Sequence, residues 1–170
     1  MQTSIHTQCV HAGSIDDPHG GVNSPVSMST AYSYLGEQGV LYPRYYNTPN
    51  QQAVAAKIAT LEQAEQALLF ASGMGAISTV ILSQLQAGDH IIVTQGGYGG
   101  TEDFMHNELP RLGINVSFCG QGINDIESAI TPKTRMIYVE TPSNPLLSVI
   151  NLSEVADLAK QYNCLSAVDN

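Results

Sequence analysis

The chain has 170 residues, of which 43% are hydrophobic and 12% charged, proportions typical of a folded globular protein. Its 15 acidic and 6 basic residues give a net charge of −9, which argues against nucleic-acid binding because such surfaces need clustered Lys and Arg. It contains no apolar run long enough to span a membrane. The first residues lack the apolar segment of a signal peptide.

The cysteines and histidines indicate neither a metal site nor a disulfide framework. Cys9, Cys119 and Cys164 are widely separated and match no zinc pattern, and the five histidines show no ligand spacing. We therefore expect no bound metal. An odd number of cysteines without an export signal favours reduced thiols and a cytoplasmic protein.

Residues 1–48 are predicted to form an irregular N-terminal arm. The segment is rich in Ser, Thr, Gly and Pro, and it lacks long periodic stretches. It also holds several tyrosines, a residue type that offers a large contact area with a polar tip: Tyr32, Tyr34, Tyr42, Tyr45 and Tyr46. We therefore expect the arm to contact another subunit.

From Pro49 onward, helical and strand-like patterns alternate, and residues 49–170 are predicted to form one α/β domain. The predicted helices begin at Pro49, follow Gly73, pass through Phe104 to Leu109, and cover 124–130, with Asn124 as cap, and 152–162. The predicted strands cover 67–70, 90–94, 114–118, 136–139 and 165–168. Apolar strands alternating with helices are typical of a mainly parallel sheet in a three-layer α/β/α fold.

The corner Ser72-Gly73-Met74 is the strongest local signal for a ligand. It joins the predicted strand 67–70 to a helix, so the first free N–H groups of that helix point at one spot and favour an anion such as phosphate. Ser72 can cap the helix and donate to a phosphate oxygen. An ordinary capped turn is the alternative at this corner.

Polar residues also follow the later strands: Tyr98, Glu140 to Asn144, and Asp169. Ligands of parallel sheets bind outside the carboxyl ends of the strands, so these residues predict a common pocket. Neither a G-x-G-x-x-G fingerprint nor a P-loop is present.

Pyridoxal phosphate (PLP) fits these groups better than a nucleotide does. The helix terminus can take its single phosphate, Tyr98 can lie on the pyridine face, and Asp169 can pair with the pyridine nitrogen. Asn144 can donate to the phenolic oxygen of the cofactor. Taken singly, Asp169 could be a helix cap and Tyr98 an edge aromatic, so the prediction rests on their conjunction.

The chain resembles the N-terminal part of the PLP-dependent enzymes of cysteine and methionine metabolism, the group with cystathionine γ-synthase, the cystathionine lyases and methionine γ-lyase. The resemblance covers nearly the whole chain, and its motifs are Tyr42-Pro43-Arg44 with Asn47, Ser72-Gly73-Met74, Tyr98-Gly99-Gly100-Thr101, Glu140-Thr141-Pro142-Ser143-Asn144-Pro145 and Ala167-Val168-Asp169-Asn170. It implies a large PLP-binding domain of fold type I.

The resemblance also implies a role for each motif residue. The amides of Gly73 and Met74 would bind the phosphate beside Ser72, and Tyr98 would stack on the ring and assist as acid or base. Asn144 and Asp169 would hold the phenolic oxygen and the ring nitrogen. Tyr42 and Arg44 would reach the phosphate of the neighbouring subunit's cofactor.

The activity implied is that of a PLP-dependent lyase or transferase of sulfur amino-acid metabolism. Such enzymes catalyse β- or γ-elimination or γ-replacement on small amino-acid substrates, as homotetramers built of tight dimers. Gly100 stands where methionine γ-lyases of the best-known type carry a cysteine, which disfavours that activity.

The family's Schiff-base lysine lies beyond the motif that ends at Asn170, and Lys57, Lys133 and Lys160 do not stand in its context. We therefore expect a truncated chain, without the C-terminal domain and inactive alone. A non-catalytic module that binds the cofactor or pairs with a full-length homologue is an alternative. Another fold-type-I enzyme, such as an aminotransferase, is disfavoured by the motifs that begin at Tyr98 and Glu140.

Overall fold

The computed structural model describes residues 3–35 and 39–170, which divide into two compact units. The first unit extends to Ala71, and the second runs from Ser72 to Asn170. The arm and domain predicted from the sequence, with their boundary at residue 48, stay a prediction. Within the described residues, every helix is too short or too polar to cross a membrane.

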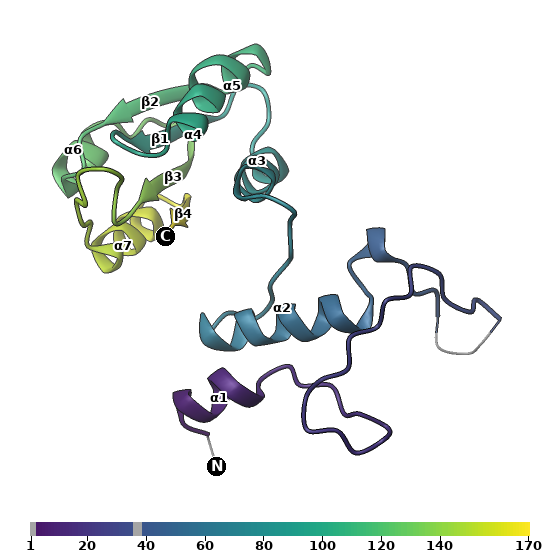
Figure 1. Cartoon of the computed structure of the whole chain (residues 1–170). Helices are drawn as coiled ribbons and strands as arrows, with labels where there is room; N and C mark the ends of the chain where they lie inside the picture. Colours follow the sequence, from purple (N-terminus) through teal and green to yellow (C-terminus); the bar gives the residue numbers. More distant parts are fainter. Residues whose placement is uncertain (1–2, 36–38) are drawn as a thin grey trace. The chain divides into compact units, whose positions relative to one another are not determined.

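The first unit contains α1 (Ile5–His11), the 3-10 helix η1 (Pro43–Tyr45) and α2 (Pro49–Leu61) (Figure 1). The helix α1 is a short regular element within the otherwise irregular arm. It is capped by the Ser4 hydroxyl, which accepts from the Thr7 amide at 3.3 Å. The Lys57 ammonium on α2 donates to the carbonyl of Val10 at 3.0 Å, so it binds the last turn of α1 to α2.

The helix α2 begins at Pro49, as the sequence predicts. Thr48 and Gln51 form a capping box, in which the Thr48 hydroxyl donates to Gln51 Oε1 at 2.8 Å. Pro49 occupies the first helical position, where an N–H would have no partner within the helix. Together these residues fix the start of the helix.

The strand predicted over 67–70 does not form. A strand needs hydrogen bonds to a neighbouring strand, and an apolar composition alone cannot supply them. Within the described residues no strand pairs with this segment. The Phe70 ring lies instead near the Tyr46 ring, with 6.1 Å between their centroids.

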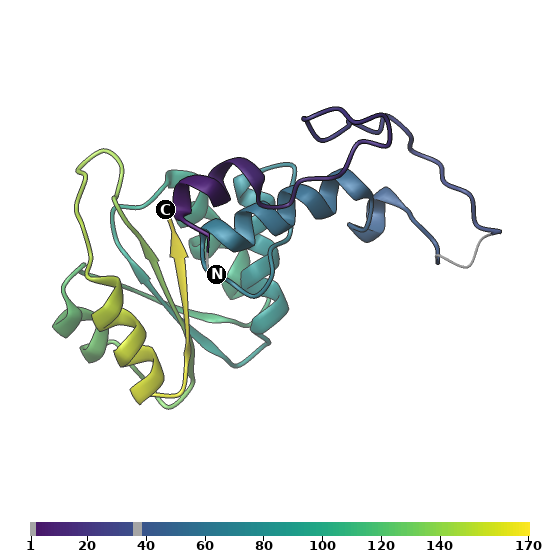
Figure 2. The ribbon, with the colours of Figure 1, turned by 90° about the horizontal axis from the view of Figure 1, so that it is seen from below.

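The second unit is built on a four-stranded sheet with the order β2-β1-β3-β4. The strands are β1 (His90–Thr94), β2 (Asn115–Cys119), β3 (Thr134–Glu140) and β4 (Leu165–Asp169), and every neighbouring pair is parallel (Figures 1 and 2). The predicted parallel α/β sheet is therefore confirmed: the bounds of β1 are as predicted, and those of the other three strands differ by one or two residues.

Helices cover both faces of this sheet and give three layers within the second unit. Side chains alternate along each strand, so Ile91 and Val93 face one side while Ile92 faces the other. The first face packs against α3 (Gly73–Gln84), the π-helical turn η2 (Phe104–Glu108) and α5 (Leu109–Arg111). The second face packs against α6 (Ile123–Ser128) and α7 (Leu152–Gln161) (Figure 1).

Two helix starts differ from the sequence prediction. The helix predicted to pass through Phe104 to Leu109 begins earlier, at Gly99, where α4 (Gly99–Asp103) starts and continues into η2. The cap of α6 is Gly122, and the predicted cap Asn124 lies inside that helix. Caps are chosen by backbone geometry, and here the turn formed by Gly120 to Gly122 ends before Asn124.

Candidate functional site

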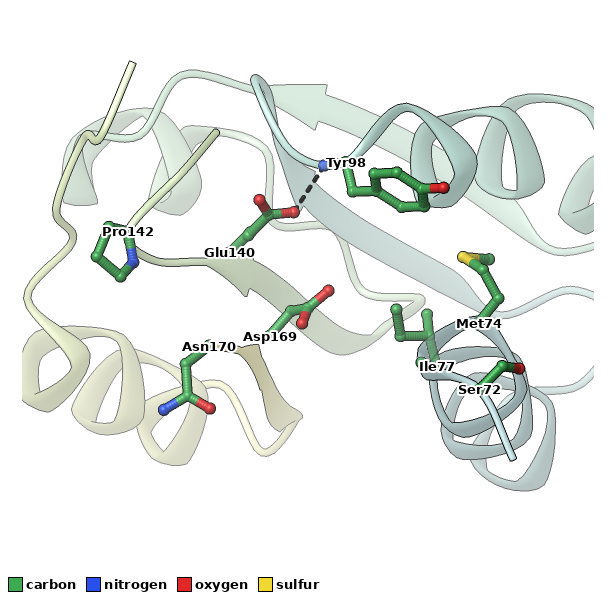
Figure 3. A pocket seen from close by; sticks show the side chains of 9 residues that line it. Ser72, Met74, Ile77, Tyr98, Glu140, Pro142, Asp169 and Asn170 are labelled. Carbon is green, nitrogen blue, oxygen red and sulfur yellow. Dashed lines mark hydrogen bonds between the residues drawn. The ribbon is translucent and has the colours of Figure 1, made fainter. Parts of the chain in front are cut away.

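A cavity of about 440 Å³ opens at the carboxyl ends of the strands, and all its lining residues belong to the second unit. They come from the start of α3, the loop before α4, and the ends of β3 and β4 (Figure 3): Ser72, Gly73, Met74, Ile77, Tyr98, Glu140, Pro142, Asp169 and Asn170. The structure thus brings together the predicted corner, the predicted aromatic residue and the predicted carboxylate.

The start of α3 forms one wall of the cavity. The Ser72 hydroxyl caps the helix by accepting from the Gly75 amide at 3.0 Å, and the Ser72 carbonyl accepts from the Ala76 amide. The amides of Gly73 and Met74 donate to no acceptor within the described part of the chain. A Cβ added at Gly73 would meet no atom within 4 Å, so the space beside these amides is open. This wall can bind an anion.

Tyr98 lies directly before α4, and its side chain is 58% exposed. Its backbone N–H donates to Glu140 Oε2 at 2.7 Å, a bond that joins the loop to the end of β3 (Figure 3). A Cβ added at Gly100 would stand 2.6 Å from the Tyr98 ring, so the absence of a side chain there leaves room for the ring. The ring is therefore an accessible aromatic surface beside the cavity.

Asp169 ends β4 and is half-buried. Its carbonyl accepts from the Thr141 amide at 3.0 Å, which extends the pairing of β3 and β4 by one bond. Its carboxylate Oδ2 accepts from the Tyr138 hydroxyl at 2.8 Å. Figure 3 shows the carboxylate directed toward the space between Ile77 and Tyr98.

Asn144 is not among the residues that line the cavity. It is exposed in the loop after β3, two residues beyond Pro142. Ser143 and Thr141 are buried and fix this loop: Ser143 N donates to the Ser148 carbonyl, and Thr141 Oγ1 accepts from Ile150 N. The predicted contact of Asn144 with the cofactor stays a prediction.

Tyr42 and Arg44 belong to the first unit and line a separate hollow of about 770 Å³ with Thr30, Pro43 and Tyr46. Arg44 Nη1 donates to the Tyr42 hydroxyl, and the guanidinium carbon lies 5.6 Å from the Tyr42 ring centroid. The Asn47 side chain accepts from the Tyr42 amide at 2.8 Å. This hollow is therefore lined by the Arg44 guanidinium and by the side chains of Tyr42 and Tyr46.

The sequence placed Glu140 and Pro142 in the stretch expected at the common pocket but gave neither of them a role, and it gave none to Ile77 or Asn170. Glu140 carried the same signal as Asp169, a carboxylate at the end of a buried strand, but its contact with the Tyr98 amide depends on the tertiary structure. Ile77 is four residues after Gly73 and faces the cavity because of helical periodicity.

Neither a metal cluster nor a lysine contributes to the cavity. Within the part of the chain that the structure describes, no group of three or more His, Cys, Asp or Glu could hold an ion. Lys133 directly precedes β3 and Lys160 lies in the last turn of α7, both toward the amino ends of the strands. Lys57 lies in the first unit.

The lining residues fit PLP. The cavity volume is within the range of roughly 300–1,000 Å³ that is usual for small-molecule pockets. Its walls offer free amides and a hydroxyl for a phosphate, an aromatic face for a ring, and a carboxylate for a protonated ring nitrogen. These are the three chemical parts of PLP.

Comparison with known proteins agrees with this fit. The model of the family "Cys/Met metabolism PLP-dependent enzyme" matches residues 6–170. The chain is 37% identical to a cystathionine β-lyase of Coxiella burnetii over 99% of its length, and 31% identical to an L-methionine γ-lyase of Fusobacterium nucleatum, also over 99%. It spans 45% and 46% of those two relatives.

A solved structure shows the same fold. The crystal structure of cystathionine γ-lyase from Lactobacillus plantarum, complexed with L-serine, superposes with a TM-score of 0.90 and 37% identity. The match covers 99% of this chain and 45% of that one. A family match over nearly the whole chain, a shared fold and a cavity with matching chemistry lead to one conclusion: the chain belongs to the family of PLP-dependent enzymes of cysteine and methionine metabolism.

Proposed function

We propose that the protein carrying this chain is a PLP-dependent lyase or transferase that acts at the β- or γ-carbon of a sulfur amino acid or an activated homoserine. The observation that supports it most is the convergence of Ser72, Tyr98 and Asp169 on one cavity. The relatives named above act as cystathionine and methionine lyases, which points to the same substrate class.

The start of α3 would bind the phosphate. The free amides of Gly73 and Met74 would donate to its oxygens, and the Ser72 hydroxyl proton remains available because its oxygen serves as the cap acceptor. The positive end of the α3 dipole adds to the attraction. A group held by several fixed donors keeps its orientation through the reaction.

Tyr98 and Asp169 would orient the ring. When bound, PLP withdraws electrons from the α-carbon of the amino acid, so that a proton there becomes acidic. Asp169 would hold a proton on the ring nitrogen, and Tyr98 would cover one face of the ring and exclude water from it. Glu140 would keep Tyr98 in place through the bond to its amide. The Tyr98 hydroxyl would then assist proton transfer near the leaving group.

The remaining roles rest on the family pattern. Asn144 would donate to the phenolic oxygen of the cofactor, and Tyr42 and Arg44 would bind the phosphate of a neighbouring subunit's cofactor. Supporting this, Arg44 is the only basic residue in the first 56, and its turn presents a guanidinium, the preferred group for phosphate. The assembly would be a homotetramer of tight dimers in the cytoplasm.

The test uses the complete protein that carries these residues. Apoprotein is titrated with PLP and followed by absorbance, and the loaded protein is assayed for keto acid released from cystathionine, methionine and cysteine, and for thiol addition to an activated homoserine. We expect PLP to bind and at least one of these substrates to react.

Asp169→Ala should weaken PLP binding by at least tenfold, since a charged hydrogen bond contributes about 1.5–3 kcal/mol. Asp157→Ala, an exposed carboxylate on α7, is the matched control and should bind PLP like the wild type. PLP binding without turnover of any of these substrates would favour the non-catalytic alternative. Unchanged binding in Asp169→Ala would contradict the assigned site.

A further inference from the structure

Tyr138 of β3 carries a buried hydroxyl that the proposed function has not used. The side chain is 5% exposed and belongs to the apolar cluster that packs the sheet against α3 and η2. Tyr138 pairs with Ala167 in the sheet register, so Asp169, two residues further along β4, lies on the same face of the sheet. The hydroxyl reaches Asp169 Oδ2 at 2.8 Å.

The Tyr138 hydroxyl is held in its protonated form. Burial raises the pKa of Tyr138 well above its usual value, and the hydrogen bond to the Asp169 carboxylate raises it further. The buried Thr101 side chain acts on this pKa in the opposite direction. At neutral pH the phenol therefore keeps its proton and donates a hydrogen bond to Asp169 Oδ2.

Because of this bond, the two carboxylate oxygens of Asp169 differ in their hydrogen bonding. Oδ2 accepts from Tyr138, whereas Oδ1 accepts from no other side chain or amide within the described residues. Asp169 lines the cavity and Tyr138 does not. A carboxylate with one oxygen bound to a rigid, buried donor loses most of its rotational freedom, and its second oxygen keeps one orientation.

We propose that Tyr138 is a positioning residue, whose donated hydrogen bond fixes the Asp169 carboxylate so that Oδ1 is presented to the pyridine nitrogen of PLP. This inference rests on the role proposed above for Asp169. The opposing view is that Tyr138 only fills the core, in which case a phenylalanine would serve equally well, because it keeps the ring and loses only the hydroxyl.

The test is the substitution Tyr138→Phe in the complete protein. We expect the dissociation constant of PLP, measured by titrating apoprotein, to rise by up to about tenfold, because binding would then have to order a carboxylate that Tyr138 otherwise holds in advance. The melting temperature of the apoprotein should stay near that of the wild type, because the ring still fills its place in the core. A purely structural role predicts that the affinity for PLP stays unchanged.

Tyr162→Phe is the matched control. Tyr162 also donates to a carboxylate, Glu127 Oε1 at 2.9 Å, but it lies on the surface outside the cavity. It should leave the affinity for PLP unchanged. A loss as large as that in Tyr138→Phe would show that the effect is not specific to Asp169 and would overturn the inference.

The double variant Tyr138→Phe with Asp169→Ala separates this inference from the proposed function. If Tyr138 acts through Asp169, the double variant binds PLP no more weakly than Asp169→Ala alone. Additive losses, or wild-type affinity in Tyr138→Phe while Asp169→Ala is weakened, would overturn the positioning role and leave the proposed function standing. Unchanged affinity in Asp169→Ala would contradict the proposed function itself.

Discussion

Single residues at the carboxyl ends of the strands define the chemistry of the cavity. Glu140 and Asp169 end neighbouring strands and are paired in register, yet they have different partners. Glu140 accepts from the Tyr98 amide at the loop before α4, whereas Asp169 accepts from a buried phenol through Oδ2 alone. Two like residues at equivalent positions thus differ in their hydrogen-bond donors, and the roles proposed for them differ accordingly.

At the opposite end of the sheet, His90 is a buried residue whose protonation is linked to stability. It is 4% exposed, with Nδ1 lying 2.7 Å from Thr134 Oγ1 and Nε2 lying 2.8 Å from Ser117 Oγ. Burial lowers the pKa of His90 in the folded state below its usual value. The unfolded chain therefore binds the proton more readily, and folding opposes protonation.

We expect this histidine to make the protein less stable as the pH falls. Its contribution is fully present above the unfolded pKa of about 6.5 and declines below it, by at most about 1.4 kcal/mol per pH unit. Urea unfolding at pH 7.5 and at pH 5 should show a smaller difference for His90→Gln than for the wild type. The exposed His19→Gln should keep the wild-type difference. Equal differences in all three proteins would rule out His90 as the group responsible.

At the scale of elements, the start of α3 combines a structural cap with the proposed phosphate site. The helix α7 offers a comparison, since Asn151 caps it by accepting from the Ser153 amide at 3.1 Å but does not line the cavity. Both caps satisfy an amide that the helix itself cannot. Of these two cap residues, Ser72 lines the cavity and Asn151 does not.

The two caps lead to a paired prediction. Ser72→Ala and Asn151→Ala should each lower the free energy of unfolding by about 1 kcal/mol, measured by urea titration. Only Ser72→Ala should also weaken PLP binding, because only its hydroxyl would reach the phosphate. If both variants lose PLP affinity equally, the loss reflects stability alone and Ser72 has no direct role.

At the scale of the whole molecule, the proposed site of one subunit would be completed by the arm of another. Arg44→Ala and Asp169→Ala would then damage two different parts of one shared site. We expect each variant to be inactive alone. When the two variants are unfolded and refolded together in equal amounts, random pairing leaves one site in four intact, so the mixture should regain roughly a quarter of wild-type activity. A mixture as inactive as its parts would contradict the shared site.

The lysines of this chain are expected to play no covalent role. Lys57 Nζ donates to the carbonyls of Cys9 and Val10, while Lys133 and Lys160 lie toward the amino ends of the strands, away from the cavity. Borohydride reduction of the loaded protein, followed by proteolysis and mass spectrometry, should leave all three without a pyridoxyl group. A stoichiometric adduct at any of them would contradict the site.

The sequence by itself determined the order of helices and strands from β1 onward, the parallel sheet, and the groups that match PLP. These follow from local causes, such as side-chain periodicity, Pro49 at a helix start and Ser72 at a cap, which act within a few residues. The segment 67–70 shows the limit, because its apolar composition predicts a strand but cannot supply a partner.

Only the tertiary structure decided which of these groups share a cavity. It brings Glu140 to the Tyr98 amide and Tyr138 to Asp169, and it leaves Asn144 outside the lining. Such contacts join residues that are 31 to 42 positions apart, so they depend on strand register and on helix packing across the sheet. No local pattern encodes strand register or helix packing, since both arise when distant elements bury their apolar faces together.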